Sequence, residues 1–161
     1  MGELAFRRIR PLLDDDDVSG FSSGNGDNDP WFGERAHRAM RDGTARVYVL
    51  PIVTGEICGF YALSAHAVAR VGALAGSLRR NAPNPIPCTL LGQLAVDERY
   101  QGKSAGARLL QDAICRAAAA SRIVASRALV VDPADEHAEG FYAHFGFQRL
   151  ASDSRRMFVR L

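Results

Sequence analysis

The stretch from Thr89 to Ala118 constrains the fold most, because it predicts a buried strand, a glycine-rich turn and a helix in direct succession. Residues Thr89 to Val96 form a mostly apolar run of strand length. After the turn, one face with helical spacing is apolar and comprises Ala105, Leu109, Leu110, Ala113, Ile114, Ala117 and Ala118. The opposite face carries Arg108, Gln111, Asp112 and Arg116. This pattern predicts a helix that packs on a sheet.

The glycine-rich turn from Gly102 to Gly106 predicts a site for an anion. Its Gly102-Lys103-Ser104 is similar to the end of a nucleotide P-loop, but Asp97 stands where that motif needs its first glycine. The dinucleotide pattern GxGxxG is also absent. Small residues at a helix N-terminus still let backbone N–H groups approach phosphate oxygens, so we expect a phosphate-binding turn in another fold.

The size and composition of the chain predict a single domain over residues 1–161. Its 161 residues are 47% hydrophobic and 24% charged, which is enough for one full core. The formal net charge of +2 does not by itself mark a nucleic-acid binder. The N-terminal segment has no long apolar run, so we expect no signal peptide, no membrane span and a cytoplasmic location. Cys58, Cys88 and Cys115 are set among apolar neighbours and are expected to be reduced core residues.

The first third of the chain predicts a strand, a helix and a hairpin. Phe6 to Leu13 is the strand, ended by Pro11 and an acidic turn at residues 14–17. Trp31 to Arg41 is the helix, with Asp29 as its cap, Pro30 in its first position and Gly43 at its end. Arg46 to Val53 and Ile57 to Ala67 alternate around the turn Thr54-Gly55, which predicts an antiparallel hairpin.

The remaining elements complete a mixed sheet with helices packed on it. Val71 to Arg80 suggests a short helix, and the three prolines of Asn81 to Cys88 predict a stiff extended loop before the buried strand. Ala128 to Val131 is a short strand. A second helix carries Ala138, Phe141, Tyr142 and Phe145 and ends at Gly146, and two strands follow at Phe147 to Leu150 and Arg156 to Arg160. The expected fold class is α/β of the mixed α+β kind, with a partly antiparallel sheet.

Two segments resemble the GNAT superfamily of N-acetyltransferases. Leu91-Gly-Gln-Leu-Ala-Val-Asp97, followed by Gln101-Gly-Lys-Ser-Ala-Gly106 and an Ala/Leu helix, resembles the acetyl-CoA loop of that family, Gln/Arg-x-x-Gly-x-Gly/Ala. Ala138-Glu-Gly-Phe-Tyr-Ala-His-Phe-Gly-Phe147 is similar to the helix-to-strand segment of the same family. The resemblance implies a GNAT-like sheet flanked by helices and acetyl-CoA as cosubstrate.

A narrower resemblance is to the TacT/AtaT-type toxins within this superfamily. It is carried by Phe21-x-Ser23-Gly24, by Asp29-x-Trp31-Phe32, by Gly59-Phe-Tyr-Ala-Leu63 and by Pro85 to Asp97. The resemblance implies acetylation of the amino group of aminoacyl-tRNA, which blocks translation. It also implies a ribbon-helix-helix antitoxin as partner and a homodimer.

The resemblance assigns roles to residues of both segments. Tyr142 matches the catalytic tyrosine that protonates the CoA thiolate, although its place in an aromatic helical stripe would otherwise favour a core role. Leu94, Ala95 and Val96 would bond the pantetheine arm and supply the oxyanion donor. The pyrophosphate would be held by Gln101, Gly102, Lys103, Ser104, Ala105 and Gly106.

Other candidate ligands are weaker. Three pairs or rows of arginines offer phosphate contacts, but such runs are more often solvated surface; they are Arg35-Arg38-Arg41, Arg79-Arg80 and Arg155-Arg156. His66, His137 and His144 include no pair at i, i+4 spacing and have no nearby cysteine, so we predict no metal site.

Two alternative functions stay open at this stage. The same loop would serve an N-acetyltransferase for a small amine, a polyamine or a protein N-terminus. Ser104 replaces the first loop glycine of the family pattern, and serine adopts a positive φ less readily. A degenerate module that binds CoA or a partner without turnover is therefore the second alternative.

Overall fold

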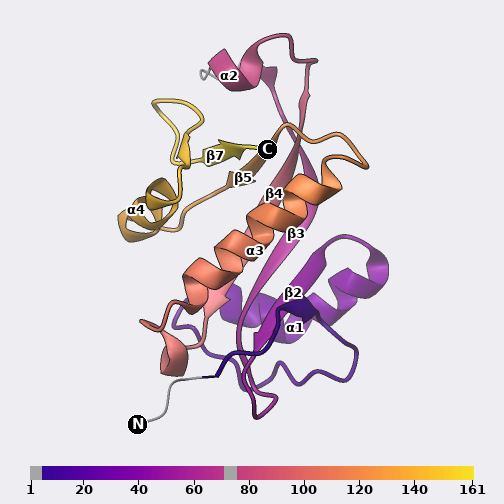
Figure 1. Cartoon of the computed structure of the whole chain (residues 1–161), viewed down its shortest axis with the longest axis vertical. Helices are drawn as coiled ribbons and strands as arrows, with labels where there is room; N and C mark the ends of the chain where they lie inside the picture. Colours follow the sequence, from indigo (N-terminus) through magenta and orange to yellow (C-terminus); the bar gives the residue numbers. More distant parts are fainter. Residues whose placement is uncertain (1–4, 71–75) are drawn as a thin grey trace. The chain divides into compact units, whose positions relative to one another are not determined.

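The computed structural model describes residues 5–70 and 76–161, and within them seven strands form one sheet in the order β1-β2-β3-β4-β5-β7-β6 (Figure 1). The predicted mixed sheet with helices packed on it is confirmed. The chain divides into two compact units. The first unit comprises the described residues up to Leu63 together with Gln93–Ala113, and the second comprises those of Ser64–Gly92 together with Ile114–Leu161. One domain over residues 1–161 stays a prediction.

The first unit is built on the hairpin of β2 (Arg46–Pro51) and β3 (Ile57–Val68), which pair antiparallel as predicted. The strand β1 (Arg10–Pro11) pairs antiparallel with β2, and the helix α1 (Asn28–Asp42) supplies Phe32 to the core. Phe32 and Phe60 stack with ring centroids 4.0 Å apart. The predicted cap Gly43 ends α1 with φ 74°.

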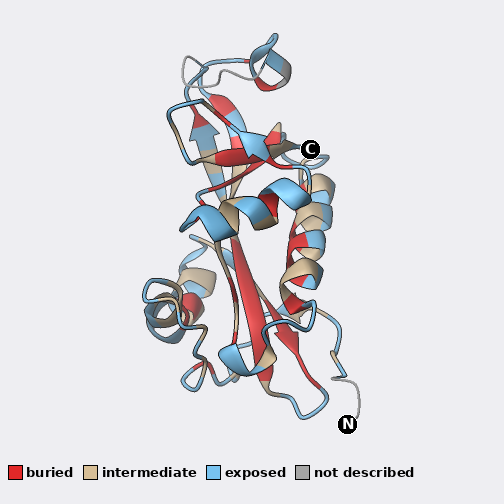
Figure 2. Ribbon diagram, turned by 90° about the vertical axis from the view of Figure 1, so that its left-hand side faces the viewer, coloured by how far each residue is buried: buried red, intermediate tan, exposed pale blue. Residues whose placement is uncertain are grey.

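The second unit contains the ladder between β4 (Ile86–Val96) and β5 (Ala128–Val131), which are parallel from Thr89↔Leu129 to Leu91↔Val131. The strand β7 (Met157–Arg160) pairs antiparallel with β5, and β6 (Gln148–Arg149) pairs with β7. The helices α2 (Gly76–Arg79) and α4 (Glu136–His144) also belong to this unit, and the core comprises Val68, Leu78, Ala82, Ile86, Cys88, Ala128, Val130, Leu150 and Phe158. Figure 2 shows the buried residues concentrated in the strands.

The helix α3 (Ala105–Ala120) confirms the strongest prediction of the sequence. Ala105, Leu109, Leu110, Ala113 and Ala117 are buried, while Ile114 and Ala118 are half-buried. At Gly59 in β3 a Cβ atom would lie 2.7 Å from the Leu109 side chain and 3.1 Å from the Ala95 carbonyl oxygen. Glycine at this position therefore lets β3, β4 and α3 approach closely within the first unit.

Several predicted boundaries were wrong. The strand expected over Phe6 to Leu13 is reduced to β1 and an isolated bridge from Phe6 to Ile52. The strand β4 begins at Ile86 rather than Thr89, because Ile86 and Cys88 are already packed in the core of the second unit. Of the helix expected over Val71 to Arg80, the structure shows α2, and residues 71–75 lie outside the described residues.

Two side-chain predictions were also wrong. Asp29 does not cap α1, because the helix begins one turn earlier, after Asp27, and the Asp29 carboxylate instead accepts hydrogen bonds from the Ser23 backbone and hydroxyl. Cys58 and Cys88 are buried as expected, but Cys115 is exposed on α3. No helix within residues 5–70 and 76–161 combines the length and apolarity that a membrane span requires.

The aromatic core of the first unit can be tested with Phe60→Ala. Phe60 is fully buried and stacks on Phe32, so its truncation leaves a cavity and lowers the free energy of unfolding by about 3–5 kcal/mol. Urea denaturation followed by circular dichroism measures the change. The matched control Ile123→Ala removes an exposed apolar side chain and changes stability by less than about 0.5 kcal/mol. Equal effects of the two substitutions would contradict this account of the core.

Candidate active site

The turn between β4 and α3 has the backbone conformation of an anion-binding loop. A short 3-10 helix η2 (Glu98–Tyr100) follows β4, and the turn then begins at Gln101. Gly102 has φ 77° and Ser104 has φ 67°, so both are left-handed. The serine that replaces a family glycine thus takes the conformation that glycine would take, at a cost of about 1–2 kcal/mol.

Backbone N–H groups at the start of α3 are available to an anion. The first hydrogen bond of the helix runs from the Arg108 N–H to the Ser104 carbonyl oxygen, at 3.1 Å. The N–H groups of residues 105–107 therefore precede the helical ladder and have no partner within it. They carry the positive end of the helix dipole, and the exposed Lys103 adds a cation at the same end. The turn from Gly102 to Gly106, called the cradle from here on, therefore has a geometry that suits a phosphate group.

Gln101 holds the turn against two other backbone segments. Its Nε2 atom donates to the Val96 carbonyl oxygen at 2.9 Å and to the Ser23 carbonyl oxygen at 3.0 Å. The side chain of Gln101 therefore positions the end of β4 and the start of the turn. Both hydrogen bonds of its amide nitrogen are to backbone, and a cofactor-binding role for Gln101 stays a prediction.

Asp97 organises the same region, and the sequence reasoning did not single it out. It is 1% exposed, and its carboxylate accepts hydrogen bonds from the backbone N–H groups of Ser22 and Arg99 and from the Arg99 guanidinium. Burial alone would raise the pKa of this carboxyl, but the hydrogen bonds from Arg99 and Ser22 outweigh it and hold the pKa below its ordinary value. Asp97 therefore stays ionised and joins residues 22–24 to the end of β4.

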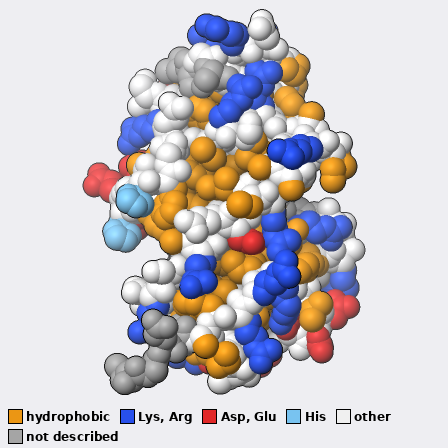
Figure 3. Space-filling model, in the orientation of Figure 1, with side chains coloured by type: hydrophobic (Ala, Val, Ile, Leu, Met, Phe, Trp, Pro, Cys, Tyr) orange, Lys and Arg blue, Asp and Glu red, His pale blue; other side chains and the backbone are white. Residues whose placement is uncertain are grey.

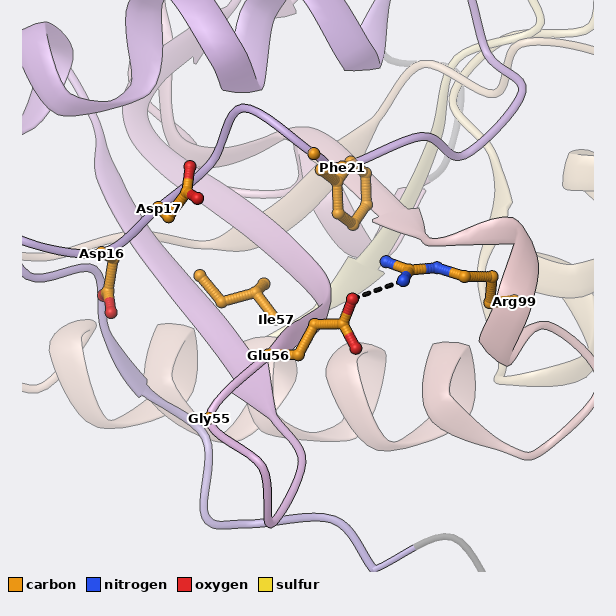
Figure 4. Close-up of a pocket in the computed structure, with 8 residues that line it drawn as sticks. Asp16, Asp17, Phe21, Gly55, Glu56, Ile57 and Arg99 are labelled. Atoms are coloured by element: carbon orange, nitrogen blue, oxygen red, sulfur yellow. Dashed lines mark ion pairs between the residues drawn. The ribbon is translucent and has the colours of Figure 1, made fainter.

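A second set of contacts extends from Arg99 to the β2–β3 turn. The Arg99 guanidinium forms an ion pair with Glu56 (Figure 4). The Tyr100 hydroxyl donates a hydrogen bond to the same carboxylate. The hydrogen bond from Tyr100 and the contacts with Arg99 lower the pKa of Glu56. Glu56 and Arg99 border an open pocket of about 170 Å³, lined by Asp16, Asp17, Gly20, Phe21, Gly55, Glu56, Ile57 and Arg99. Its three carboxylates make it unsuitable for a diphosphate.

The predicted pantetheine-binding residues Leu94, Ala95 and Val96 lie on β4 beyond its last pairing with β5, which is at Leu91. The side chain of Ala95 is buried in the core of the first unit, so the main chain is what this position offers a ligand. The alternation of buried residues along β4 changes phase between Cys88 and Leu91.

Tyr142 lies on α4 in the second unit and is 7% exposed. Its ring contacts those of Phe141 and Phe147, so the helical stripe seen in the sequence is indeed packed. Burial raises the pKa of its phenol well above the ordinary value. The hydroxyl makes no hydrogen bond to a described residue. The raised pKa keeps the phenol of Tyr142 protonated, and among the described residues its oxygen has no hydrogen-bond partner, which suits a proton donor.

The structure separates the candidate arginines into engaged and available side chains. Arg156 makes a bidentate contact with Asp132 at 2.7 and 2.8 Å, and Arg155 lies 3.6 Å from Glu139. Arg38 is paired with Asp42. Exposed side chains that make no ion pair with a described residue are those of Arg35, Arg41, Arg79 and Arg80. On the face shown in Figure 3, basic side chains are more prominent than acidic ones.

His66 is engaged as well, because its Nε2 atom lies 2.9 Å from the Arg156 guanidinium. Since guanidinium nitrogens only donate, the imidazole nitrogen accepts, and burial together with this cation lowers the pKa of His66. In the part of the chain that the structure describes, no three His, Cys, Asp or Glu residues are grouped to hold a metal ion.

A strand that continues beyond its pairing with β5, followed by a left-handed turn and a helix N-terminus, is the arrangement that the resemblance to acyl-CoA-binding transferases predicts. The chain matches the model of the acetyltransferase (GNAT) family over residues 7–147. It therefore belongs to the GNAT family, and the predicted membership is confirmed.

Individual relatives narrow the similarity. A tRNA-acetylating toxin of Mycobacterium tuberculosis is 40% identical over 144 residues, which cover 89% of this chain and 86% of the toxin. The structure of AtaT complexed with acetyl-methionyl-tRNAfMet is 28% identical, with a TM-score of 0.86 over 95% of this chain and 94% of that one. A tyrosine-to-phenylalanine mutant of AtaT, bound to the C-terminus of the antitoxin AtaR and acetyl-CoA, is 26% identical with a TM-score of 0.77, covering 95% and 92%.

The role of Asp97 predicts a pH-dependent loss of stability in Asp97→Asn. At pH 7 the variant is expected to lose about 2 kcal/mol, because the buried acceptor no longer carries the charge that Arg99 and two N–H groups compensate. The folded-state pKa is lowered, so this stabilisation is present above the unfolded-state pKa and disappears as the pH falls through the folded-state value.

Urea denaturation of the wild type and Asp97→Asn between pH 7 and pH 3 measures this effect. The difference in stability should be largest near neutrality and shrink below about pH 4. The exposed control Asp14→Asn is expected to change stability by less than about 0.5 kcal/mol. A difference that stayed constant down to pH 3 would rule out the charge of Asp97 as its source.

The backbone of Ser104 predicts that Ser104→Gly stabilises the fold. Glycine takes φ 67° without a steric cost, and part of the gain is offset by the greater freedom of the unfolded chain. The expected net gain is about 0.5–1 kcal/mol, seen as a rise of about 2–3 °C in Tm. Ser104→Ala keeps the strain and serves as the control. A gain for alanine equal to that for glycine would mean that the hydroxyl, and not the backbone, decides the result.

Proposed function

We propose that this protein is an acetyl-CoA-dependent N-acetyltransferase of toxin type that acetylates the amino group of aminoacyl-tRNA. The observation that carries the proposal is the left-handed turn at Gly102 to Gly106 at the start of α3, which follows the part of β4 beyond its last pairing with β5. Support for the acceptor comes from the 40% identical tRNA-acetylating toxin and from the fold shared with AtaT in complex with acetyl-methionyl-tRNAfMet.

The cofactor would be held along β4, the turn and α3. The N–H groups of residues 105–107 would bind the diphosphate of acetyl-CoA, and the main chain of Leu94 to Val96 would bond the pantetheine arm. A main-chain N–H of that segment would also face the thioester oxygen as negative charge develops on it. Support for acetyl-CoA comes from the AtaT mutant that was solved with it bound.

In the transfer step the neutral amine attacks the thioester carbonyl carbon, so that a C–N bond forms and the C–S bond breaks. One proton leaves the attacking nitrogen for solvent, and the sulfur receives a proton from Tyr142. The raised pKa of Tyr142 keeps its phenol protonated until the thiolate forms. A strong base is unnecessary, because α-amino groups titrate near pH 8 and an ester bond lowers that value further.

The partners follow from this chemistry. Acetylation removes the nucleophile that peptide-bond formation needs, so the active protein would stop translation and would act in the cytoplasm, where charged tRNA is found.

A ribbon-helix-helix antitoxin would restrain it, and the AtaT structure with the C-terminus of AtaR supports an antitoxin partner. We also propose a homodimer. The available side chains of Arg35 and Arg41 on α1 would contact tRNA phosphates.

The test is transfer of labelled acetyl from acetyl-CoA to a mixed pool of aminoacyl-tRNA. Tyr142→Phe removes the donated proton and should lower kcat by about 10²–10⁴-fold while acetyl-CoA still binds. Tyr48→Phe, a half-buried tyrosine on β2, is the matched control and should keep full activity. Uncharged tRNA should accept no label.

Two results would contradict the proposal. Wild-type protein that binds acetyl-CoA but labels no aminoacyl-tRNA would redirect the search to small amines, polyamines or protein N-termini. Full activity of Tyr142→Phe would remove that residue from the mechanism while leaving the substrate assignment intact.

A further inference from the structure

Gln93 on β4 carries a buried oxygen atom without a hydrogen-bond partner. Among the described residues, its Oε1 is the single buried side-chain oxygen or nitrogen of which this is true. More than nine in ten buried polar atoms in folded proteins are paired, because an unpaired one loses its hydration and gains nothing in return. A buried oxygen of this kind indicates a site for a ligand that donates a hydrogen bond to it.

The position of Gln93 in the strand indicates which ligand this is. Pairing of β4 with β5 ends at Leu91, so Gln93 lies two residues beyond the last residue of β4 that pairs with β5. It immediately precedes Leu94, the first residue proposed to bond the pantetheine arm of acetyl-CoA. The bare oxygen therefore belongs to the stretch along which the thioester and its attacker would meet.

The chemistry of the attack favours an amide oxygen at such a place. The acceptor amine attacks only in its neutral form, which still offers N–H groups to an acceptor. A carboxylate would also accept those hydrogen bonds, but its charge would stabilise the ammonium form and hold the amine protonated. An amide oxygen orients the amine without that penalty. The carboxylate that follows in sequence, Asp97, is already engaged by Ser22 and Arg99.

We propose that Gln93 Oε1 accepts a hydrogen bond from the attacking amine of the acceptor and directs its lone pair at the thioester carbonyl carbon. Gln93 would thus be a substrate-binding residue of the reaction. This inference rests on the proposed acetyl transfer to aminoacyl-tRNA. The C–N bond forms as the C–S bond breaks, the spare proton of the amine leaves for solvent, and the proton on sulfur comes from Tyr142.

The first test is Gln93→Met, which keeps the length of the side chain and removes the acceptor. The free protein should become more stable, with Tm higher by about 2–4 °C, because an unpaired buried oxygen is gone. At the same time kcat/KM for labelled acetyl transfer to aminoacyl-tRNA should fall about tenfold, with the Kd for acetyl-CoA unchanged. Gln111→Met, an exposed glutamine on α3, is the control and should change none of the three.

The second test is Gln93→Glu, which keeps the acceptor and adds a charge. The carboxylate should stabilise the ammonium form of the acceptor, so the acidic limb of the pH profile of kcat/KM should move upward by about one pH unit. A residue with a purely structural role would leave the pH profile of the remaining activity where it was.

The outcomes separate this inference from the proposed function. If the wild type labels no aminoacyl-tRNA, the proposed function fails and takes this inference with it. If the wild type is active and Gln93→Met is equally active, the Gln93 inference alone is overturned. If Gln93→Met lost acetyl-CoA affinity by the same factor as kcat/KM, the oxygen would be assigned to a pantetheine amide. That result would also overturn the Gln93 inference. A lower Tm together with lost activity would make Gln93 a structural residue, which is the third contrary result.

Discussion

The buried carboxylate of Asp97 is the interaction on which the candidate site depends. Isolated burial of an ionised carboxyl is strongly unfavourable, and here two backbone N–H groups and the Arg99 guanidinium compensate for it. The same hydrogen bonds join residues 22–24 to the end of β4. The Gln101 side chain donates hydrogen bonds to the carbonyl oxygens of Val96 and Ser23. The start of the turn is therefore fixed to two backbone segments. The direction in which α3 presents its first N–H groups follows from this arrangement.

The backbone strain of the turn offsets part of the stabilisation that the hydrogen bonds of Asp97 and its neighbours provide. A non-glycine residue in the left-handed region is costly, and Ser104 is held there between a fixed strand end and a well-packed helix. The five buried residues of α3 from Ala105 to Ala117 determine where the helix begins, so the strain cannot relax by shifting it. Loss of the family glycine is therefore compatible with an intact cradle, which weakens the interpretation of the chain as a degenerate module.

Local patterns predicted those parts of the fold that local forces determine. The strand β5 and the helix α3 were found because their apolar spacing decides both their type and their extent. Asp29 was misread as a cap because its true partner, Ser23, lies across an irregular loop. The contacts of Asp97, Arg99 and Glu56 were not predicted for the same reason. They join residues up to 75 positions apart, and no sequence spacing encodes them. The cofactor turn was recognisable because family resemblance and helix physics coincide there.

The charges around the site also explain how an acyl transferase works with few ionisable groups. Two carboxylates of the first unit near the turn are paired, Asp97 with Arg99 and Glu56 with Arg99 and the Tyr100 hydroxyl. A free carboxylate would hold an amine acceptor in its ammonium form, and the cradle at α3 would lose part of its attraction for a diphosphate. In the proposed mechanism, the chemistry then depends on the helix N-terminus, main-chain N–H groups, the protonated phenol of Tyr142 and the neutral amide of Gln93. An aminoacyl ester suits such a site, because its amine is already neutral in large part near pH 7 and needs to be oriented more than it needs to be deprotonated.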